Sequence, residues 1–222
     1  MEQYIQQYSE KTIALLRNLP TGEIAKAMNI LQAAFERDGR IYVIGNGGSL
    51  ALATHWVADF NKTVFSHNLT GQQRRFQAIR IPTTEEELTA WANDIGYDMV
   101  FAGPLGNYIQ ESDVLIAISS SGNSENIIRA VDLARAHQVP VIGVSGFDGG
   151  RLNPLSDASV LIATPCGEYE LVEGVHAVIL HLFTKYFKDY FSYIQIARKD
   201  VTEEYALATQ LLSVAASGYR VA

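Results

Sequence analysis

Cysteine is almost absent from this sequence of 222 residues, in which Cys166 is the only one. A single cysteine cannot form a disulfide within the chain, which is typical of proteins from reducing compartments. No nucleophile motif surrounds Cys166, and a lone cysteine of this kind is more often a packed residue than a reactive one. The sequence therefore gives no support for a disulfide scaffold or a cysteine nucleophile.

Basic residues are outnumbered by acidic ones. The chain has 17 Lys and Arg against 24 Asp and Glu, a formal net charge of -7 and a pI of about 5.2. Non-specific binding of nucleic acid needs clustered positive charge, so we expect no nucleic-acid partner. An anionic ligand must be attracted by a local site rather than by the surface as a whole.

Long apolar runs are missing as well. No segment approaches the roughly 20 apolar residues that span a bilayer, and the first residues show no basic region followed by an apolar run. We therefore expect a cytoplasmic protein with no membrane partner. With 48% hydrophobic and 18% charged residues, the composition is that of a globular chain rather than a disordered one.

What the sequence does contain is an alternation of β-rich and helical segments. Apolar residues at helical spacing predict helices over residues 4–37, interrupted at Pro20-Thr21-Gly22. Predicted strands at 40–44, 76–81, 113–118 and 139–144 are separated by predicted helices at 50–61, 85–92 and 125–137. A turn at Gly149-Gly150 leads to the last predicted strand, 158–162, and a predicted helix at 171–190 closes the domain. The alternation predicts a three-layer α/β fold: a doubly wound, five-stranded parallel sheet of flavodoxin-like order 2-1-3-4-5, with N-terminal helices.

The chain is predicted to form one domain over residues 1–190, of which 1–38 are its N-terminal helical part. A further helical segment over 191–222, with apolar residues such as Tyr205 and Leu211, is predicted as a C-terminal extension. It could pack on the domain or on a partner subunit. The large apolar face of the N-terminal helices favours an oligomer interface.

Two Gly- and Ser-rich turns follow the first and third predicted strands. They are Gly45-Asn46-Gly47-Gly48-Ser49 and Ser119-Ser120-Ser121-Gly122-Asn123-Ser124, and each precedes a helix. In a sheet of this order both turns border the ligand crevice. Helix N-termini carry unpaired N–H groups that attract anions, and serine hydroxyls add donors without bulk. A helix cap needs only one serine, so the second turn favours a phosphate site.

Together with Ala92-Asn93-Asp94 and the segment from Gly143 to Gly150, these turns resemble the SIS (sugar isomerase) domain family, in particular its phosphoheptose isomerases. The resemblance covers residues 3–187 and implies a homotetramer with active sites shared between subunits. It implies that the substrate is held by Asn46, Gly47, Ser49, Asp94, Ser119, Ser120, Ser121 and Ser124, of which Ser49, Ser119, Ser121 and Ser124 hold the phosphate. Ser120 stands where this branch usually has Thr.

An aldose–ketose isomerase moves a proton between adjacent carbons through an enediol(ate), which needs a base and an acid or metal. His55 and Asp59 lie four apart on one predicted helix face, and Glu173 and His181 lie eight apart on another. The resemblance implies that these four residues bind a divalent metal, zinc in some members, and that Asp59 and His181 are the acid–base pair.

Two residues depart from the family pattern. Asp59 replaces Glu, and Glu173 replaces Gln, so that Glu173 could share the role of base. We predict Asp59, Glu173 and His181 as catalytic residues, and all four residues as metal ligands. His176 lies on a different helix face from His181 and is predicted to be structural.

The predicted function is the isomerisation of sedoheptulose 7-phosphate to the aldose phosphate. The alternative is a non-catalytic SIS protein that binds a sugar phosphate and acts as a regulator or partner-binding tetramer. An isomerase for a different sugar phosphate is the other alternative. The segments 63–75 and 165–172, which are expected to set the sugar length, depart from the phosphoheptose pattern.

Overall fold

A parallel five-stranded sheet forms the centre of the protein. The computed structural model describes the backbone of residues 1–65 and 74–217 and the side chains of these residues up to 193, so most of the segment 63–75 lies outside the described residues. The strands are β1 Arg40–Gly45, β2 Gln77–Arg80, β3 Val114–Ser119, β4 Val141–Gly146 and β5 Ala158–Ile162. Their order β2-β1-β3-β4-β5, all parallel, confirms the predicted topology.

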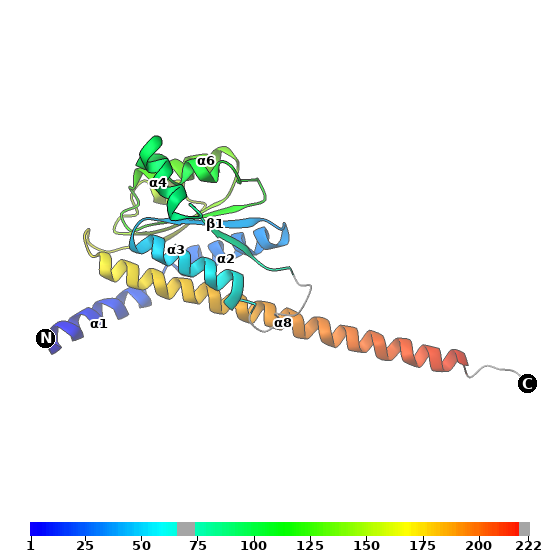
Figure 1. The fold of residues 1–222 in the computed structure, drawn as a ribbon. Coiled ribbons are helices and arrows are strands. Elements are labelled where there is room, and N and C mark those ends of the chain that lie inside the picture. The colour runs from blue at the N-terminus through cyan, green and yellow to red at the C-terminus, as the bar shows by residue number, and fades with distance from the viewer. Residues whose placement is uncertain (66–73, 218–222) are drawn as a thin grey trace, which may run out of the picture.

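Helices cover both faces of this sheet (Figure 1). One face carries α2 Thr21–Glu36, α3 Gly48–Ala58 and α8 Tyr169–Ser217; the other carries α4 Glu85–Asp94, α5 Ala102–Leu105, α6 Glu125–Ala136 and α7 Leu152–Leu155. Successive side chains of a strand point to opposite faces. Along β1, Ile41 and Val43 accordingly join one core cluster, and Tyr42 and Ile44 join the other.

The N-terminal helix α1, Glu2–Arg17, lies on the surface and has no buried residue. It is tied to the start of α8 by an ion pair between Lys11 and Glu168 at 2.9 Å and by a hydrogen bond from Tyr8 Oη to the Glu170 carbonyl at 3.2 Å. The chain turns at Pro20, and α2 begins with the next residue. The break predicted at Pro20 is therefore confirmed.

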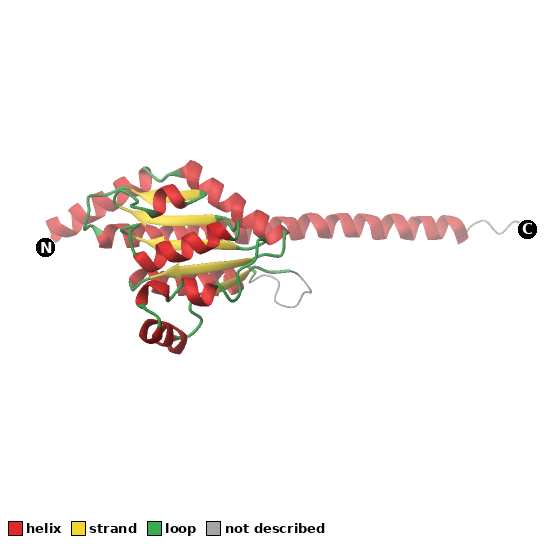
Figure 2. Ribbon diagram, turned by 90° about the horizontal axis from the view of Figure 1, so that it is seen from above, coloured by secondary structure: helices red, strands yellow, loops and turns green. Residues whose placement is uncertain are grey.

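Helix α8 is much longer than predicted. It runs for 49 residues, about 74 Å at 1.5 Å per residue. Its first half packs on the sheet through buried Val175, Ile179, Phe183 and Phe187, and the remainder projects away from the domain in both views (Figures 1 and 2). The helix predicted over 171–190 and the helical extension predicted from 191 form one continuous helix as far as Ser217, because the sequence has neither Gly nor Pro between Gly174 and Gly218. Residues 218–222 of the predicted extension lie outside the described residues. Among the described residues, no helix is long and apolar enough to cross a membrane.

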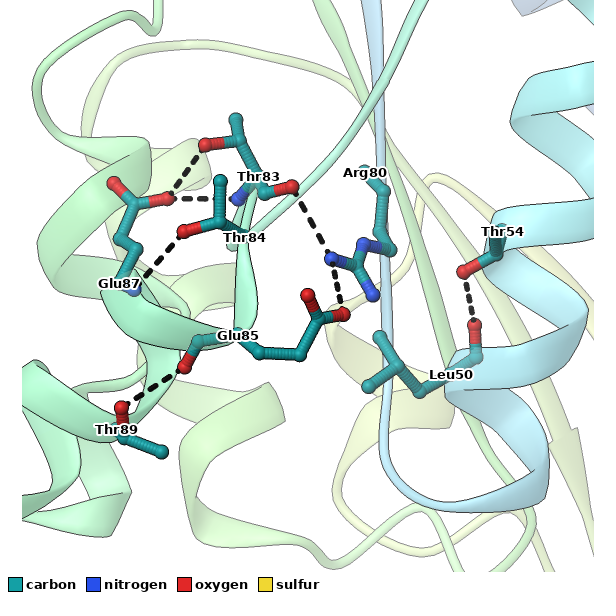
Figure 3. A network of polar contacts seen from close by, with 8 residues as sticks. All are labelled: Leu50, Thr54, Arg80, Thr83, Thr84, Glu85, Glu87 and Thr89. Atoms are coloured by element: carbon teal, nitrogen blue, oxygen red, sulfur yellow. Dashed lines mark hydrogen bonds and ion pairs between the residues drawn. The ribbon is translucent and has the colours of Figure 1, made fainter.

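Helix α3 continues directly into a π-helical turn, η1 Asp59–Thr63. Helix α4 begins at a capping arrangement drawn in Figure 3, in which Thr84 Oγ1 accepts a hydrogen bond from the backbone N–H of Glu87 at 3.1 Å. The Glu87 carboxylate returns to the backbone N–H of Thr83 at 2.7 Å. Helix α4 leads to a short 3-10 turn, η2 Tyr97–Met99, which lies against α6.

Candidate active site

The serine-rich loop between β3 and α6 is held in shape by a second loop. Gly122 has a φ of +63°, and a Cβ there would lie 2.0 Å from the carbonyl oxygen of Gly149. The backbone N–H of Leu152 donates to the Gly122 carbonyl at 2.9 Å. A side chain at position 122 is excluded by both the backbone conformation and this close approach. The turn at Gly149 and Gly150 therefore packs against the serine-rich loop and holds its conformation.

A cavity of about 140 Å³ opens above the loop. Its walls are Asn46, Ser49, Ile118, Ser119, Ser120, Ser121, Ser124, Tyr169 and Glu173. All five serines predicted to bind substrate thus converge on one space. The Ser120 hydroxyl is buried there without a hydrogen-bond partner among the described residues, as expected of a group that serves a ligand. Tyr169, from the segment 165–172 that is expected to set the sugar length, also lines the cavity.

A second cavity, of about 290 Å³, adjoins the first. It is lined by Gly48, Ser49, Ala51, Leu52, His55 and Glu173. Ser49 and Glu173 belong to both cavities. A Cβ at Gly48 would lie 2.5 Å from Glu173 Oε2, so the carboxylate of Glu173 lies directly on the N-terminal turn of α3. The partial positive charge of a helix N-terminus stabilises a carboxylate in that place.

His55, Asp59 and His181 form a compact group beside the second cavity. Asp59 Oδ2 lies 3.8 Å from His55 Nε2 and 3.6 Å from His181 Nδ1. The two imidazole rings lie edge to face, with their centroids 5.0 Å apart. One potential ligand atom from each of the three residues lies within 4.8 Å of the others, so the group could hold a metal ion.

Glu173, the fourth ligand predicted from the resemblance, is not one of the three residues of this group, but it lines the second cavity together with His55. It shares a helix face with His181, but eight residues separate the two along α8, about 12 Å of helix. Its carboxylate lies at the start of α3, whereas Asp59 follows the end of α3. The set of four metal ligands therefore stays a prediction.

Asp59 itself accepts hydrogen bonds from two hydroxyl groups that no sequence motif connects with it. Thr63 Oγ1 donates to Asp59 Oδ1 at 2.9 Å, and Thr184 Oγ1 donates to Asp59 Oδ2 at 3.1 Å. The Asp59 side chain is 13% exposed, and those of His55 and His181 are 49% and 58% exposed. The carboxylate is therefore enclosed, while both rings remain accessible.

The residues predicted to contact the sugar lie in different surroundings. Asn46 pairs with Asn126 through two amide hydrogen bonds of 2.9 Å and accepts a third from Tyr97 Oη at 3.0 Å. Gly47 precedes α3 with a φ of +52°. Asp94, at the end of α4, accepts a hydrogen bond from Asn93 and lines neither cavity.

His176 is fully buried behind the site, where its Nε2 contacts the Ser145 carbonyl oxygen at 3.0 Å. Burial lowers the pKa of His176 to about 4, because the charged form is poorly solvated there. The side chain is therefore neutral at pH 7 and lines neither cavity.

Comparison with known proteins places the fold and the motifs in one family. A family model described as the SIS domain matches residues 3–146. The phosphoheptose isomerase of Helicobacter hepaticus is 35% identical over 166 residues, which cover 73% of this chain and 79% of that protein. The phosphoheptose isomerase of Edwardsiella ictaluri is 36% identical over 163 residues, covering 72% and 79%.

Solved structures agree with the sequence relatives. The phosphoheptose isomerase GmhA from Neisseria gonorrhoeae superimposes with a TM-score of 0.74 and 26% identity, covering 85% of this chain and 98% of that one. A phosphoheptose isomerase from Francisella tularensis gives a TM-score of 0.73 and 25% identity, covering 85% and 96%. The chain therefore belongs to the SIS domain family, within its phosphoheptose isomerase branch.

Proposed function

We propose that the protein is a phosphoheptose isomerase, which converts sedoheptulose 7-phosphate to the corresponding aldose 7-phosphate. The observation that carries the proposal is the pair of adjoining cavities: one is walled by five serines, the other reaches His55, and Glu173 borders both. The names of the relatives and solved structures that the chain matches support the same activity.

The phosphate is assigned to the serine-walled cavity. It lies at the N-terminus of α6, whose first residue is Glu125, so unpaired N–H groups and the helix dipole favour an anion there. The hydroxyls of Ser119 and Ser124, 3.4 Å apart, and the unpartnered hydroxyl of Ser120 supply further donors. Asn46 at the edge of the same cavity is assigned to the sugar chain.

With the phosphate in that cavity, the sugar extends past Glu173 toward His55. The reaction moves a proton from C1 of the ketose to C2 through an enediol(ate) across the two carbons. At the same time the C1 hydroxyl loses its proton and becomes the aldehyde oxygen, and the C2 carbonyl oxygen gains a proton and becomes a hydroxyl. Glu173 borders both cavities, so we assign the carbon proton transfer to this carboxylate. We assign to His181 the transfer of the proton between the substrate oxygens on C1 and C2.

Asp59 is better suited to orienting the histidines and holding a metal than to reaching a carbon. Both of its oxygens accept hydrogen bonds from threonines, and its side chain is only 13% exposed. Two His and one carboxylate match the ligand set of many catalytic zinc sites, which keep one position open. We therefore propose zinc at His55, Asp59 and His181, where it would polarise a substrate oxygen.

The site is further proposed to work within a cytoplasmic homotetramer. Apolar side chains are exposed on α1, where Tyr4 and Ile5 are 73% and 57% exposed, and on α8, where Val178, Leu182 and Tyr186 follow one another every fourth residue. The two helices contact each other. Exposed apolar side chains on two neighbouring helices are typical of an interface between subunits.

Proton exchange tests the activity directly. The purified full-length protein is incubated with sedoheptulose 7-phosphate in D₂O, and deuterium at C1 and formation of the aldose are followed by NMR. We expect exchange in the wild type and its loss in Glu173→Ala and His181→Ala; Glu173→Gln is avoided, because Gln is the residue that the family resemblance implies at this position. Glu170→Gln on the same helix and His137→Ala at the surface are the controls and should retain it. A wild type that binds the sugar phosphate saturably without exchange would contradict the proposal and favour a regulator.

A further inference from the structure

The π-helical turn η1 begins at Asp59, the residue that lies between the two histidines. The turn is closed by a hydrogen bond from the backbone N–H of Val64 to the carbonyl of Asp59, 3.0 Å long and five residues apart. π-Helical turns are rare and are frequent at functional sites. Here the turn ends at Thr63, whose hydroxyl lies 2.9 Å from Asp59 Oδ1.

The second oxygen of the same carboxylate is reached from another element. Thr184 on α8 is 5% exposed, and its hydroxyl lies 3.1 Å from Asp59 Oδ2 and 3.0 Å from the Leu180 carbonyl oxygen. A hydroxyl has a single proton to donate. The ionised carboxylate is the stronger acceptor, so the proton is directed to Asp59.

The two hydroxyls fix the rotation of the carboxylate as well as its position. Thr63 binds Oδ1 and Thr184 binds Oδ2, which leaves the remaining side of Oδ2 facing His55 Nε2 and His181 Nδ1. An aspartate reaches one methylene less far than the glutamate that the family resemblance implies at this position. Placement errors on the ångström scale lower catalytic rates strongly, so a short carboxylate depends on such supports.

We propose that Thr63 and Thr184 are positioning residues that hold Asp59 in the orientation in which one oxygen faces both histidines. The inference rests on the role assigned to Asp59 under the proposed function. Hydrogen-bond partners of metal ligands typically change metal affinity or activity by about 10- to 100-fold when removed. Neither threonine lines the two cavities described above, so their effect on binding of the sugar phosphate should be small.

The test replaces each hydroxyl by a methyl group of similar size. Thr184→Val and Thr63→Val are compared with Thr184→Ser and Thr63→Ser, which retain the hydroxyl. Thr54→Val is the matched control: Thr54 lies on α3 and donates to the Leu50 carbonyl at 3.0 Å, away from Asp59 (Figure 3). The readouts are the dissociation constant for Zn²⁺ alone, measured by competition with a chromophoric chelator, together with kcat, KM and the thermal midpoint.

We expect the valine variants to bind Zn²⁺ about 10- to 100-fold more weakly and to lose kcat by a similar factor, with KM within about threefold of the wild type. The serine variants and Thr54→Val should remain within about threefold in every readout. Valine variants that fold, bind Zn²⁺ and turn over like the wild type would overturn the inference and leave the proposed function intact. A wild type that neither binds Zn²⁺ nor exchanges the substrate proton would overturn both.

Discussion

At the scale of single residues, Glu173 lies where it does because Gly48 has no side chain. The carboxylate occupies the space of a Cβ at position 48, with Oε2 at 2.5 Å and Oε1 at 3.2 Å from it. This position also places the negative charge at the N-terminus of α3. Gly48, which has no side chain to react, therefore controls the placement of Glu173, to which the proton transfer is assigned.

Gly48→Ala should displace Glu173 and leave the fold intact. The new methyl group meets only the end of a side chain, and alanine suits the first turn of a helix better than glycine does. We expect kcat to fall by about 10-fold or more, since small displacements of a catalytic group are costly. Steady-state kinetics measures this, with Gly22→Ala in the first turn of α2 as control, because nothing lies within 4 Å of a Cβ there. Equal kinetics for the two variants would argue against a role of Glu173 in the reaction.

The buried His176 predicts how stability depends on acid. Its pKa is about 4 in the folded protein against 6.5 when exposed, so the unfolded chain binds a proton first as the pH falls. The free energy of unfolding should therefore decrease from about pH 6.5 downward and level off near pH 4, by about 3 kcal/mol in all from this residue. At pH 7 His176 is largely neutral in both the folded and the unfolded chain, so it does not lower the free energy of unfolding there.

Urea unfolding at pH 7, 5.5 and 4.5 measures that decrease. Other groups also titrate in this range, so the diagnostic quantity is the difference between the wild type and His176→Gln, which should show a shallower pH dependence. His137→Gln, at an exposed position, is the control and should follow the wild type. Parallel curves for all three proteins would contradict the assigned shift.

At the scale of elements, the start of α4 depends on the cap shown in Figure 3. Thr84 accepts the N–H of Glu87 in the first turn, and three acidic residues there match the helix dipole. Thr84→Ala should lower the free energy of unfolding by about 1 kcal/mol, measured by denaturant titration. Thr89→Ala is the control, since Thr89 donates to the Glu85 carbonyl within the helix and satisfies no free N–H. A loss as large for Thr89 as for Thr84 would contradict the capping role.

The elements show which parts of this protein are readable from sequence. Buried strands such as 114–119 and the serine loop after it were predicted, because a strand, its turn and the next helix are local in the chain. The π-helical turn and the contact of Asp59 with Thr184 were missed, since these two residues lie 125 positions apart and meet only through packing of α8 on α3 and η1. The helical period predicted that Glu173 faces the site, and Glu173 lines the cavity that also reaches His55.

At the scale of the whole molecule, α8 is both a part of the domain and an arm beyond it. Its buried side chains end at Phe191 among the residues whose side chains are described, and the following turns extend away from the sheet (Figure 2). The predicted division into a domain over 1–190 and an extension over 191–222 stays a proposal. It implies that the arm contributes little to the stability of the domain.

Truncation tests that implication. A chain that ends at residue 193 retains the buried core and should keep its thermal midpoint within about 3 °C, since less than about 1 kcal/mol is lost. A chain that ends at residue 186 loses the buried Phe187 and Phe191, each worth about 3–5 kcal/mol when removed from a core, and should be unfolded or close to it. Light scattering on the chain that ends at residue 193 then measures the particle mass and so locates the subunit interface. An unchanged number of chains per particle, obtained by dividing the particle mass by the mass of the shortened chain, assigns assembly to the exposed apolar faces of α1 and the first half of α8, whereas a smaller number assigns it to the arm. A large fall of the midpoint on removal of 194–222 would contradict the proposed boundary, because the arm would then stabilise the fold through its own contacts.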